Sequence, residues 1–394
     1  MKACAAGAPR VDRVVTATDP ATHPGGHTRF AALDSLRGIA ALGVAAYHIH
    51  GDGLLLNSAL VRSGWLWVDF FFVLSGFVIA ASYGERLAGG FAVRRFMLLR
   101  LGRIYPLHIA VLALYLGIEL VRWGFQPQGW SLNAPFAGLR SPEYLVASTL
   151  LIQTFLTNPS AWNPQSWSIA VEVWLYLAAA LLWRSLGGRG WMVALAAAAV
   201  AGALIVAQVT LPVLTWGVLR GIAGFGLGIA CWHWRGRLPG GTLAEVLCLL
   251  AIAAVFLLPL AEPAPLADFA FAATVLVFAR ERGAISRILL QRWALFLGTL
   301  SYSLYMVHVF VIARGMDGLR LVGLGSVTLV DGVAYKQIVA APWLADVLGV
   351  GLIAACVPVA WLTWRFIEWP ARAWSRRRAE AMGVAEQERS APTI

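Results

Sequence analysis

The sequence predicts an all-α integral membrane bundle of about ten transmembrane helices with both termini in the cytoplasm. Of its 394 residues, 59% are hydrophobic and only 13% are charged, which is more apolar surface than a soluble core can bury. Apolar stretches of roughly 17–25 residues also recur along the chain, and a helix needs that length to cross a bilayer. A β-barrel would show short segments of alternating polarity instead.

The expected spans form one membrane domain, residues 33–374, between a mobile N-terminal tail, residues 1–32, and a basic C-terminal tail, residues 375–394. They are residues 33–50, 64–84, 104–123, 166–184, 190–208, 212–234, 242–260, 264–280, 294–313 and 344–366. The N-terminal tail lacks the apolar core of a cleavable signal, so the first helix is expected to act as a signal anchor. Residues 143–157 are expected to be re-entrant or interfacial. An eleventh crossing there is the alternative, but it would place the C-terminus outside, against the distribution of basic residues.

The net charge of +11 is explained better by membrane topology than by a nucleic-acid partner. If the tails and connections are assigned in turn to the two sides of the membrane, one side holds 24 Lys and Arg residues and the other side holds six. Basic residues concentrate on the cytoplasmic side of membrane proteins. The sequence therefore predicts a multi-pass protein of the cytoplasmic (inner) membrane that binds no nucleic acid.

Arg37 and His48 give the first expected helix two polar groups on one face. They are eleven positions apart, and eleven steps of about 100° return a helix to within roughly 20° while it rises about 16 Å. Arg37 then lies near the inner boundary, where Asp34 can pair with it, and His48 lies just beyond mid-membrane. Either residue alone is typical of an interfacial arginine or a hydrogen-bonded histidine, but together they favour a functional site.

Two acidic residues in other expected spans lie at a depth similar to that of His48. Asp69 and Glu172 are expected roughly 7–9 Å below the outer surface, where either carboxylate could approach His48. A metal site is not predicted, because His48 and His50 point about 200° apart around a helix. The four cysteines form no CxxC pair, so neither a disulfide nor a metal is inferred from them.

The ninth expected helix carries a polar stripe, because Ser301, Tyr305 and His308 follow i, i+4, i+7 spacing. Interhelical hydrogen bonds explain such a stripe as well as a functional role does. Arg220 lies inside the sixth expected helix among several glycines that permit close helix packing. A buried guanidinium needs an anion or carbonyl groups nearby, so Arg220 is a further candidate.

Four arginines, Arg94, Arg95, Arg100 and Arg103, lie in one short connection before the third expected helix. The positive-inside rule accounts for them as a topology signal. Arg100 and Arg103, however, are three residues apart in an expected helical segment, and guanidinium groups bind phosphate through two hydrogen bonds. These residues alone do not decide between a phosphate-binding site and a topology signal.

Six strings in order resemble the membrane acyltransferase-3 family across nearly all of residues 33–374. They are LDSLRG at 33–38, VDFFFVLSGFVI at 68–79, RLGRIYP at 100–106, SWSIAVE at 166–172, SYSLYMVH at 301–308 and FIEWPAR at 366–372. Arg37 of the first string and His48 together meet the family's R-x10-H pattern, and Arg100 and Arg103 are the two arginines of the third string. No extracytoplasmic hydrolase-like domain follows the bundle, so the sequence resembles the stand-alone form of the family.

This resemblance implies transfer of an acyl group, commonly acetyl, from cytoplasmic acyl-CoA to a hydroxyl group. The expected acceptor is an extracytoplasmic or lipid-linked carbohydrate or glycolipid, as in O-acetylation during polysaccharide modification, and a small secondary metabolite is the alternative left open. Acyl-CoA, most simply acetyl-CoA, is then a co-substrate, and no bound cofactor is expected. Arg100 and Arg103, with Arg37, are expected to hold the anionic nucleotide at the inner face.

The same reaction gives His48 the role of general base, which imidazole suits near neutral pH, although an acyl-histidine intermediate is also possible. Glu172 or Asp69 is expected to orient the imidazole, as the acid does in hydrolytic triads. An oxyanion or acceptor contact is further expected from one or more of Arg220, Ser301, Tyr305 and His308.

Two other classes of protein would also place polar groups inside the membrane. A transporter or flippase of a glycan or lipid-linked sugar needs them along its substrate pathway, but the sequence shows no matched halves with interrupted helices. A scaffold is disfavoured, because burial of histidine, carboxylates and arginine costs free energy without a structural need. Acyl-CoA binding would favour the enzyme, and acceptor movement without acylation would favour the transporter.

Overall fold

The computed structural model describes residues 29–125, 134–156, 161–209, 214–259, 262–330 and 333–390. Its helices are α1 (Ala31–Tyr47), α2 (Ala59–Arg62), α3 (Trp67–Ile79), α4 (Glu85–Ala88), α5 (Val93–Phe125), α6 (Pro142–Thr149), α7 (Ser166–Leu186), α8 (Gly190–Val206), α9 (Trp216–Trp234), α10 (Thr242–Leu257), α11 (Ala264–Phe278), α12 (Ala284–Leu289), α13 (Arg292–Leu321), α14 (Pro342–Thr363) and α15 (Trp369–Ser390). Its strands are β1 (Gly325–Val330) and β2 (Val333–Ile338). Most of the predicted N-terminal tail, residues 1–28, lies outside the described ranges.

Each stretch predicted as a membrane span is helical over most of its described residues, while residues 212–213 and 260 of two predicted spans lie outside the described ranges. Within the described ranges, five helical stretches are long and apolar enough to cross a membrane, namely Ala59–Ala88, Val93–Phe125, Ser166–Val206, Arg292–Leu321 and Pro342–Val384. The helices α10 and α11 are apolar but shorter. The chain is thus a predominantly helical, multi-pass membrane protein.

Two predicted connections and one predicted tail contain regular structure. Residues 143–156 hold the short helix α6, whose eight residues span only about 12 Å and cannot cross the bilayer. The connection 314–343 holds the end of α13 and an antiparallel hairpin in which Gly325 of β1 pairs with Ile338 of β2. The fold is therefore not wholly helical. The C-terminal tail, expected from residue 375, continues α15 as far as Ser390.

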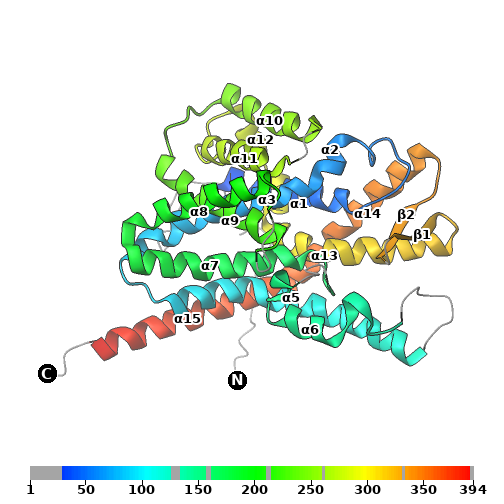
Figure 1. Ribbon diagram of the computed structural model, residues 1–394, viewed down its shortest axis with the longest axis horizontal. Coiled ribbons are helices and arrows are strands. Elements are labelled where there is room, and N and C mark those ends of the chain that lie inside the picture. The colour runs from blue at the N-terminus through cyan, green and yellow to red at the C-terminus, as the bar shows by residue number, and fades with distance from the viewer. Residues whose placement is uncertain are drawn as a thin grey trace, which may run out of the picture.

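The long helices lie alongside one another, and the two ends of the bundle differ. Figure 1 shows the β1–β2 hairpin at one end and α15 projecting at the other, while α5, α7 and α13 run between them. The backbone amide of Ile338 donates to the carbonyl of His50 at 2.8 Å, so the hairpin is fixed to the end of α1. At the opposite end α15 packs against α5, where Gly102 faces Ser375.

A pair of glycines brings α1 against α13. A Cβ atom added to Gly38 would lie 2.5 Å from the carbonyl carbon of Leu297, and one added to Gly298 would lie 2.5 Å from the carbonyl oxygen of Asp34. Only hydrogen fits at both positions, which lets the two backbones touch. This close approach sets the register between the two helices that carry Arg37, His48 and the polar stripe.

A second pair of glycines brings α3 against α9. A Cβ atom at Gly76 would meet the carbonyl oxygen of Phe225 at 2.0 Å, and one at Gly228 would meet the carbonyl oxygen of Val73 at 2.0 Å. The hydrophobic effect does not bring helices together in lipid, so close packing at small residues such as these stabilises their association instead. One consequence is that Arg220 of α9 reaches Asp69 of α3.

Candidate active site

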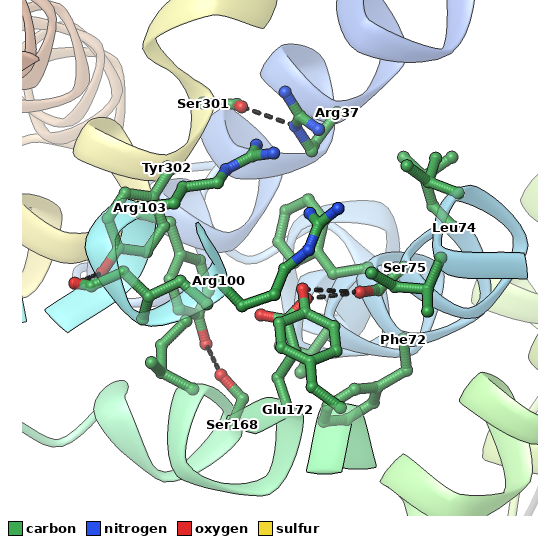
Figure 2. A pocket seen from close by; sticks show the side chains of 18 residues that line it. Arg37, Phe72, Leu74, Ser75, Arg100, Arg103, Ser168, Glu172, Ser301 and Tyr302 are labelled. Atoms are coloured by element: carbon green, nitrogen blue, oxygen red, sulfur yellow. Dashed lines mark hydrogen bonds between the residues drawn. The ribbon is translucent and has the colours of Figure 1, made fainter. Parts of the chain in front are cut away.

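A cavity of about 90 Å³ lies between α1, α3, α5, α7 and α13 and collects most of the predicted polar residues. Its polar lining consists of Arg37, Ser75, Arg100, Arg103, Ser168, Glu172, Tyr176, Ser301, Tyr302 and Tyr305. We call it the inner cavity, because three of these residues are arginines of the predicted cytoplasmic side. Figure 2 shows the side chains of Arg37, Arg100 and Arg103, which come from two different helices, around this space.

Arg37 is held in the inner cavity by the packing of α1 on α13. Its Nε donates to the Ser301 hydroxyl at 2.7 Å, and its Nη2 lies 3.3 Å from a carboxylate oxygen of Asp34. The expected pairing with Asp34 is therefore present. The first residue of the polar stripe, Ser301, faces Arg37 across the interface between the two helices.

Arg100 and Arg103 reach the same cavity from α5. The guanidinium of Arg100 lies 4.5 Å from the ring centre of Tyr83, a cation–π distance. Within the described part of the chain neither arginine has a carboxylate partner within ion-pair distance. With Arg37, these residues place three guanidinium groups beside one lining carboxylate, Glu172. The cavity thus suits an anionic ligand.

Glu172 lies in the inner cavity, away from the partner that the sequence suggested for it. One of its oxygens accepts hydrogen bonds from the hydroxyls of Ser75 and Tyr176, both at 2.5 Å. No hydrogen bond joins Glu172 to His48 among the described residues. The expectation placed Glu172 by depth alone, whereas its side chain points from α7 towards α3.

A second cavity of about 380 Å³ adjoins the first and contains His48. It is lined by Val44, Tyr47, His48, Trp65, Val68, Pro164, Gln165, Trp167, Trp216, Arg220 and Tyr305. We call it the outer cavity. Val68 and Tyr305 line both cavities, so these two side chains form a shared wall between the arginines and the histidine.

His48 ends α1 and meets a second histidine there. Its Nδ1 lies 2.9 Å from the carbonyl oxygen of Val44 and 3.3 Å from Nε2 of His308. His308 is fully buried on α13, and its Nδ1 lies 2.7 Å from the carbonyl oxygen of Tyr305. His308 therefore occupies the place beside His48 that the sequence assigned to a carboxylate.

Asp69 and Arg220 form a buried ion pair. Arg220 donates from Nε and Nη2 to the two carboxylate oxygens of Asp69, at 2.9 and 2.7 Å, and Nη2 also donates to the Trp65 carbonyl at 3.2 Å. The expected anion for Arg220 is thus Asp69, and Asp69 does not contact His48. Asp268, which is 3% exposed, acts electrostatically on both members of the pair.

Tyr305 lines both cavities, and its hydroxyl group also forms hydrogen bonds at the start of α7. Its hydroxyl lies 2.6 Å from the hydroxyl of Ser168 and donates to the carbonyl of Gln165 at 3.2 Å. Each member of the predicted stripe on α13 therefore faces a different partner. Ser301 meets Arg37, Tyr305 meets α7, and His308 meets His48.

Two buried carboxylates, Glu368 and Asp268, were not among the predicted site residues, although Glu368 belongs to the FIEWPAR string at 366–372. Glu368 is 1% exposed, accepts from the Ser303 hydroxyl at 2.8 Å and pairs with Arg372 at 3.3 Å. Glu368 and Asp268 both fall in or beside apolar stretches, and a carboxylate in that setting is itself a sign of function. The tryptophans that line the outer cavity could not be singled out from the sequence, because the chain holds eighteen tryptophans and their spacing does not distinguish these three.

The comparisons with known proteins agree with these motifs. A family model described as an acyltransferase domain matches residues 30–365. Protein 2 in picA locus, from Rhizobium radiobacter, is 42% identical over 87 residues, which are 22% of this chain and 44% of that protein. Acyltransferase MdmB, from Streptomyces mycarofaciens, is 34% identical over 170 residues, which are 40% of each chain.

The chain thus spans less than half the length of these two curated relatives, and no solved structure matches it. The family match, by contrast, runs from just before α1 into the π-helical segment Trp364–Glu368 that follows α14. It includes every residue from Arg37 to His308 that lines the two cavities or joins the histidine pair. The chain belongs to the acyltransferase-3 family of membrane proteins.

Proposed function

We propose that this acyltransferase moves an acyl group, most simply acetyl, from cytoplasmic acyl-CoA to a hydroxyl of an extracytoplasmic or lipid-linked carbohydrate. The observation that carries the proposal is the pair of adjoining cavities. One holds three arginines and the other holds His48, with Val68 and Tyr305 between them. A long thioester donor can then enter from one side of the membrane while its acceptor enters from the other.

The inner cavity supports the choice of donor. Acyl-CoA joins a polyanionic nucleotide to a long, nearly neutral arm that ends in the thioester. Three guanidinium groups attract phosphates, but the cavity of about 90 Å³ is too narrow for the nucleotide itself. The nucleotide would therefore stay at the arginine-rich mouth while the arm extends towards Tyr305, so its charge never has to cross the bilayer.

The outer cavity supports the choice of acceptor. Its lining combines three tryptophans and two tyrosines with the polar side chains of Gln165, Arg220 and His48. Sugar rings present apolar C–H faces that pack on aromatic rings, and their hydroxyls need a few directed polar partners. A volume of about 380 Å³ is large enough for a sugar unit.

The reaction follows from these positions. The acceptor oxygen attacks the thioester carbonyl as His48 Nε2 takes the hydroxyl proton, so that a C–O bond forms. The tetrahedral intermediate then collapses, the C–S bond breaks, and the CoA thiolate leaves and is protonated by the histidinium. Tyr305, on the shared wall, and Arg220 are the candidate donors to the oxyanion. Neither Asp69 nor Glu172 contacts the base in this scheme, so their part in catalysis is indirect.

The topology proposed is ten crossings in the inner membrane with both termini in the cytoplasm. Two exposed residues test it, Tyr335 on the hairpin and Arg378 on α15. With Cys4 replaced by serine, background labelling is expected to stay low, because the free thiols of Cys231, Cys248 and Cys356 are buried. A membrane-impermeant maleimide applied to whole cells is expected to label Tyr335→Cys but not Arg378→Cys, and the reverse pattern would overturn the proposed orientation.

Arg103→Ala is expected to weaken acyl-CoA binding roughly 10- to 100-fold, because one charge-assisted contact to phosphate is lost. Calorimetric titration of the purified protein with acetyl-CoA measures this. Arg287→Ala removes the same charge from an exposed position outside the cavity and serves as the matched control. If the two variants bind acetyl-CoA with equal affinity, Arg103 acts only as a topology signal.

The proposed function itself is tested in proteoliposomes with labelled acetyl-CoA and candidate glycans. The expected product is an acetyl ester on the glycan, formed together with free CoA. Adjoining cavities also suit a transport pathway, so glycan movement across the bilayer is measured in the same vesicles. Movement of the glycan without acetyl-CoA binding or ester formation would replace the enzyme with a transporter.

A further inference from the structure

We infer that His308 is a positioning residue that fixes the tautomer of His48 and leaves Nε2 of His48 as the nitrogen that accepts the proton. This inference rests on the proposed function, in which His48 is the general base. The two rings lie 4.9 Å apart between centres and at 65° to each other. They come from α1 and α13, so the pair exists only because these two helices meet.

The register between α1 and α13 places His48 and His308 at the same height along the two helices. At Gly38 and Gly298 the backbones of α1 and α13 pack too closely for a Cβ atom. His48 lies ten residues after Gly38, and His308 lies ten residues after Gly298, so each is about 15 Å further along its helix. Because Arg37 also meets Ser301, the helices run in parallel and keep this register.

Hydrogen bonds to carbonyl groups show which nitrogens carry protons. A carbonyl oxygen only accepts, so Nδ1 of His308, 2.7 Å from the Tyr305 carbonyl, is the protonated nitrogen of that ring. Nε2 of His308 is then an acceptor. In the same way Nδ1 of His48, 2.9 Å from the Val44 carbonyl, is protonated.

The contact of 3.3 Å between His48 Nδ1 and His308 Nε2 is therefore a donor facing an acceptor. The opposite tautomer of His48 would turn its Nδ1 lone pair towards two other lone pairs, those of His308 Nε2 and the Val44 carbonyl. With Nδ1 protonated, Nε2 of His48 is free of hydrogen and makes no hydrogen bond within the described residues. His48 lines the outer cavity, where the acceptor hydroxyl would donate to this nitrogen.

The same arrangement also serves the protonated state. When His48 takes the acceptor's proton on Nε2, its Nδ1 still donates to Val44 and His308, which stabilises the new positive charge. A carboxylate has this role in hydrolytic triads. Here the nearby carboxylates are engaged elsewhere, Asp69 with Arg220 and Glu172 with Ser75. A neutral histidine takes their place, and the resting pair carries no net charge in the membrane.

Two substitutions at His308, made in the full-length protein in liposomes, separate this role from simple packing. Leucine keeps much of the volume but removes the acceptor, whereas glutamine can present its amide oxygen near the position of Nε2. We expect His308→Leu to lower kcat roughly 10- to 100-fold, the loss typical of groups that orient metal-bound histidines through their second ring nitrogen, with little change in the KM for acetyl-CoA. His308→Gln is expected to restore most of kcat.

The double variant His48→Ala/His308→Leu tests whether His308 acts through His48. If it does, the double variant is no slower than His48→Ala alone, because residues that act as one unit are not additive. A further loss in the double variant would overturn the positioning role. So would an unchanged kcat for His308→Leu while His48→Ala is inactive, an outcome that leaves the proposed function standing.

Solid-state ¹⁵N spectra of histidine-labelled protein give a readout that does not depend on activity. At neutral pH the wild-type His48 signals, assigned by comparison with His48→Ala, are expected to show a protonated Nδ1 and a bare Nε2. A protonated Nε2 would overturn the inference even if the enzyme is active. Because this measurement uses the wild-type protein, it can overturn the inference even if a His308 variant fails to fold. Full turnover by His48→Ala would instead defeat the proposed function.

Discussion

Replacing His48 by alanine is expected to lower kcat for acyl transfer by roughly 10²- to 10⁴-fold, the contribution typical of a general base. The loss follows from position, since His48 is the histidine that lines the outer cavity in the described structure. Its neighbour His308 is fully buried and turns Nε2 towards His48 rather than towards the acceptor. Affinity for acetyl-CoA should change little, because the arginines that bind it lie in the inner cavity.

The matched control is His50→Ala, two residues further along. The His50 ring lies 6.1 Å from Tyr335 of the hairpin, and its backbone carbonyl, which alanine retains, receives the amide of Ile338. This variant should keep near-normal kcat and the same abundance in the membrane. Comparable losses for both variants would indicate that this end of α1 is needed for folding rather than for proton transfer.

The second large effect expected is on stability, from Asp69→Ala. Asp69 is 0% exposed and Arg220 is 6% exposed, and they share two hydrogen bonds. Removal of one partner leaves a buried charge uncompensated, which typically costs about 3–5 kcal/mol. A much lower thermal unfolding temperature in detergent and reduced abundance in the membrane would register this loss.

The double variant Asp69→Leu/Arg220→Met is the informative comparison. An apolar pair of similar volume often matches a buried ion pair in stability, so most of the unfolding temperature should return. Activity should not return, because Arg220 lines the outer cavity. Asp268→Asn should be milder than Asp69→Ala, since Asp268 makes no hydrogen bond to Arg220 in the described structure. A wild-type unfolding temperature for Asp69→Ala would contradict this account of the pair.

The sequence predicted most of the helical fold because the bilayer imposes it. Apolar length and basic flanking residues are local properties, and a helix satisfies its own backbone hydrogen bonds in lipid. The shared face of Arg37 and His48 was predictable for the same reason, since it needs only the geometry of one helix. In the structure both residues contact α13, at Ser301 and His308.

Partners on different helices were harder to predict, because depth does not give the direction in which a side chain points. Asp69 and Glu172 were expected beside His48 from their depth alone. The glycine contacts of α3 with α9 direct Asp69 to Arg220, and α7 turns Glu172 towards Ser75. The hairpin after α13 was not among the predictions, although β-branched residues flank an Asp-Gly pair at 331–332 in the sequence, which is a common signal for a two-residue hairpin turn.

The central claim is that His48 converts an acyl-CoA thioester into an ester at the wall between the two cavities. Its most direct test is the release of free CoA from labelled acetyl-CoA by purified wild-type protein and by His48→Ala, each in liposomes with a glycan acceptor. The account predicts CoA release and label on the glycan with the wild-type protein only, while both proteins bind acetyl-CoA. Equal release by the two proteins, or none by either despite normal folding, would contradict it.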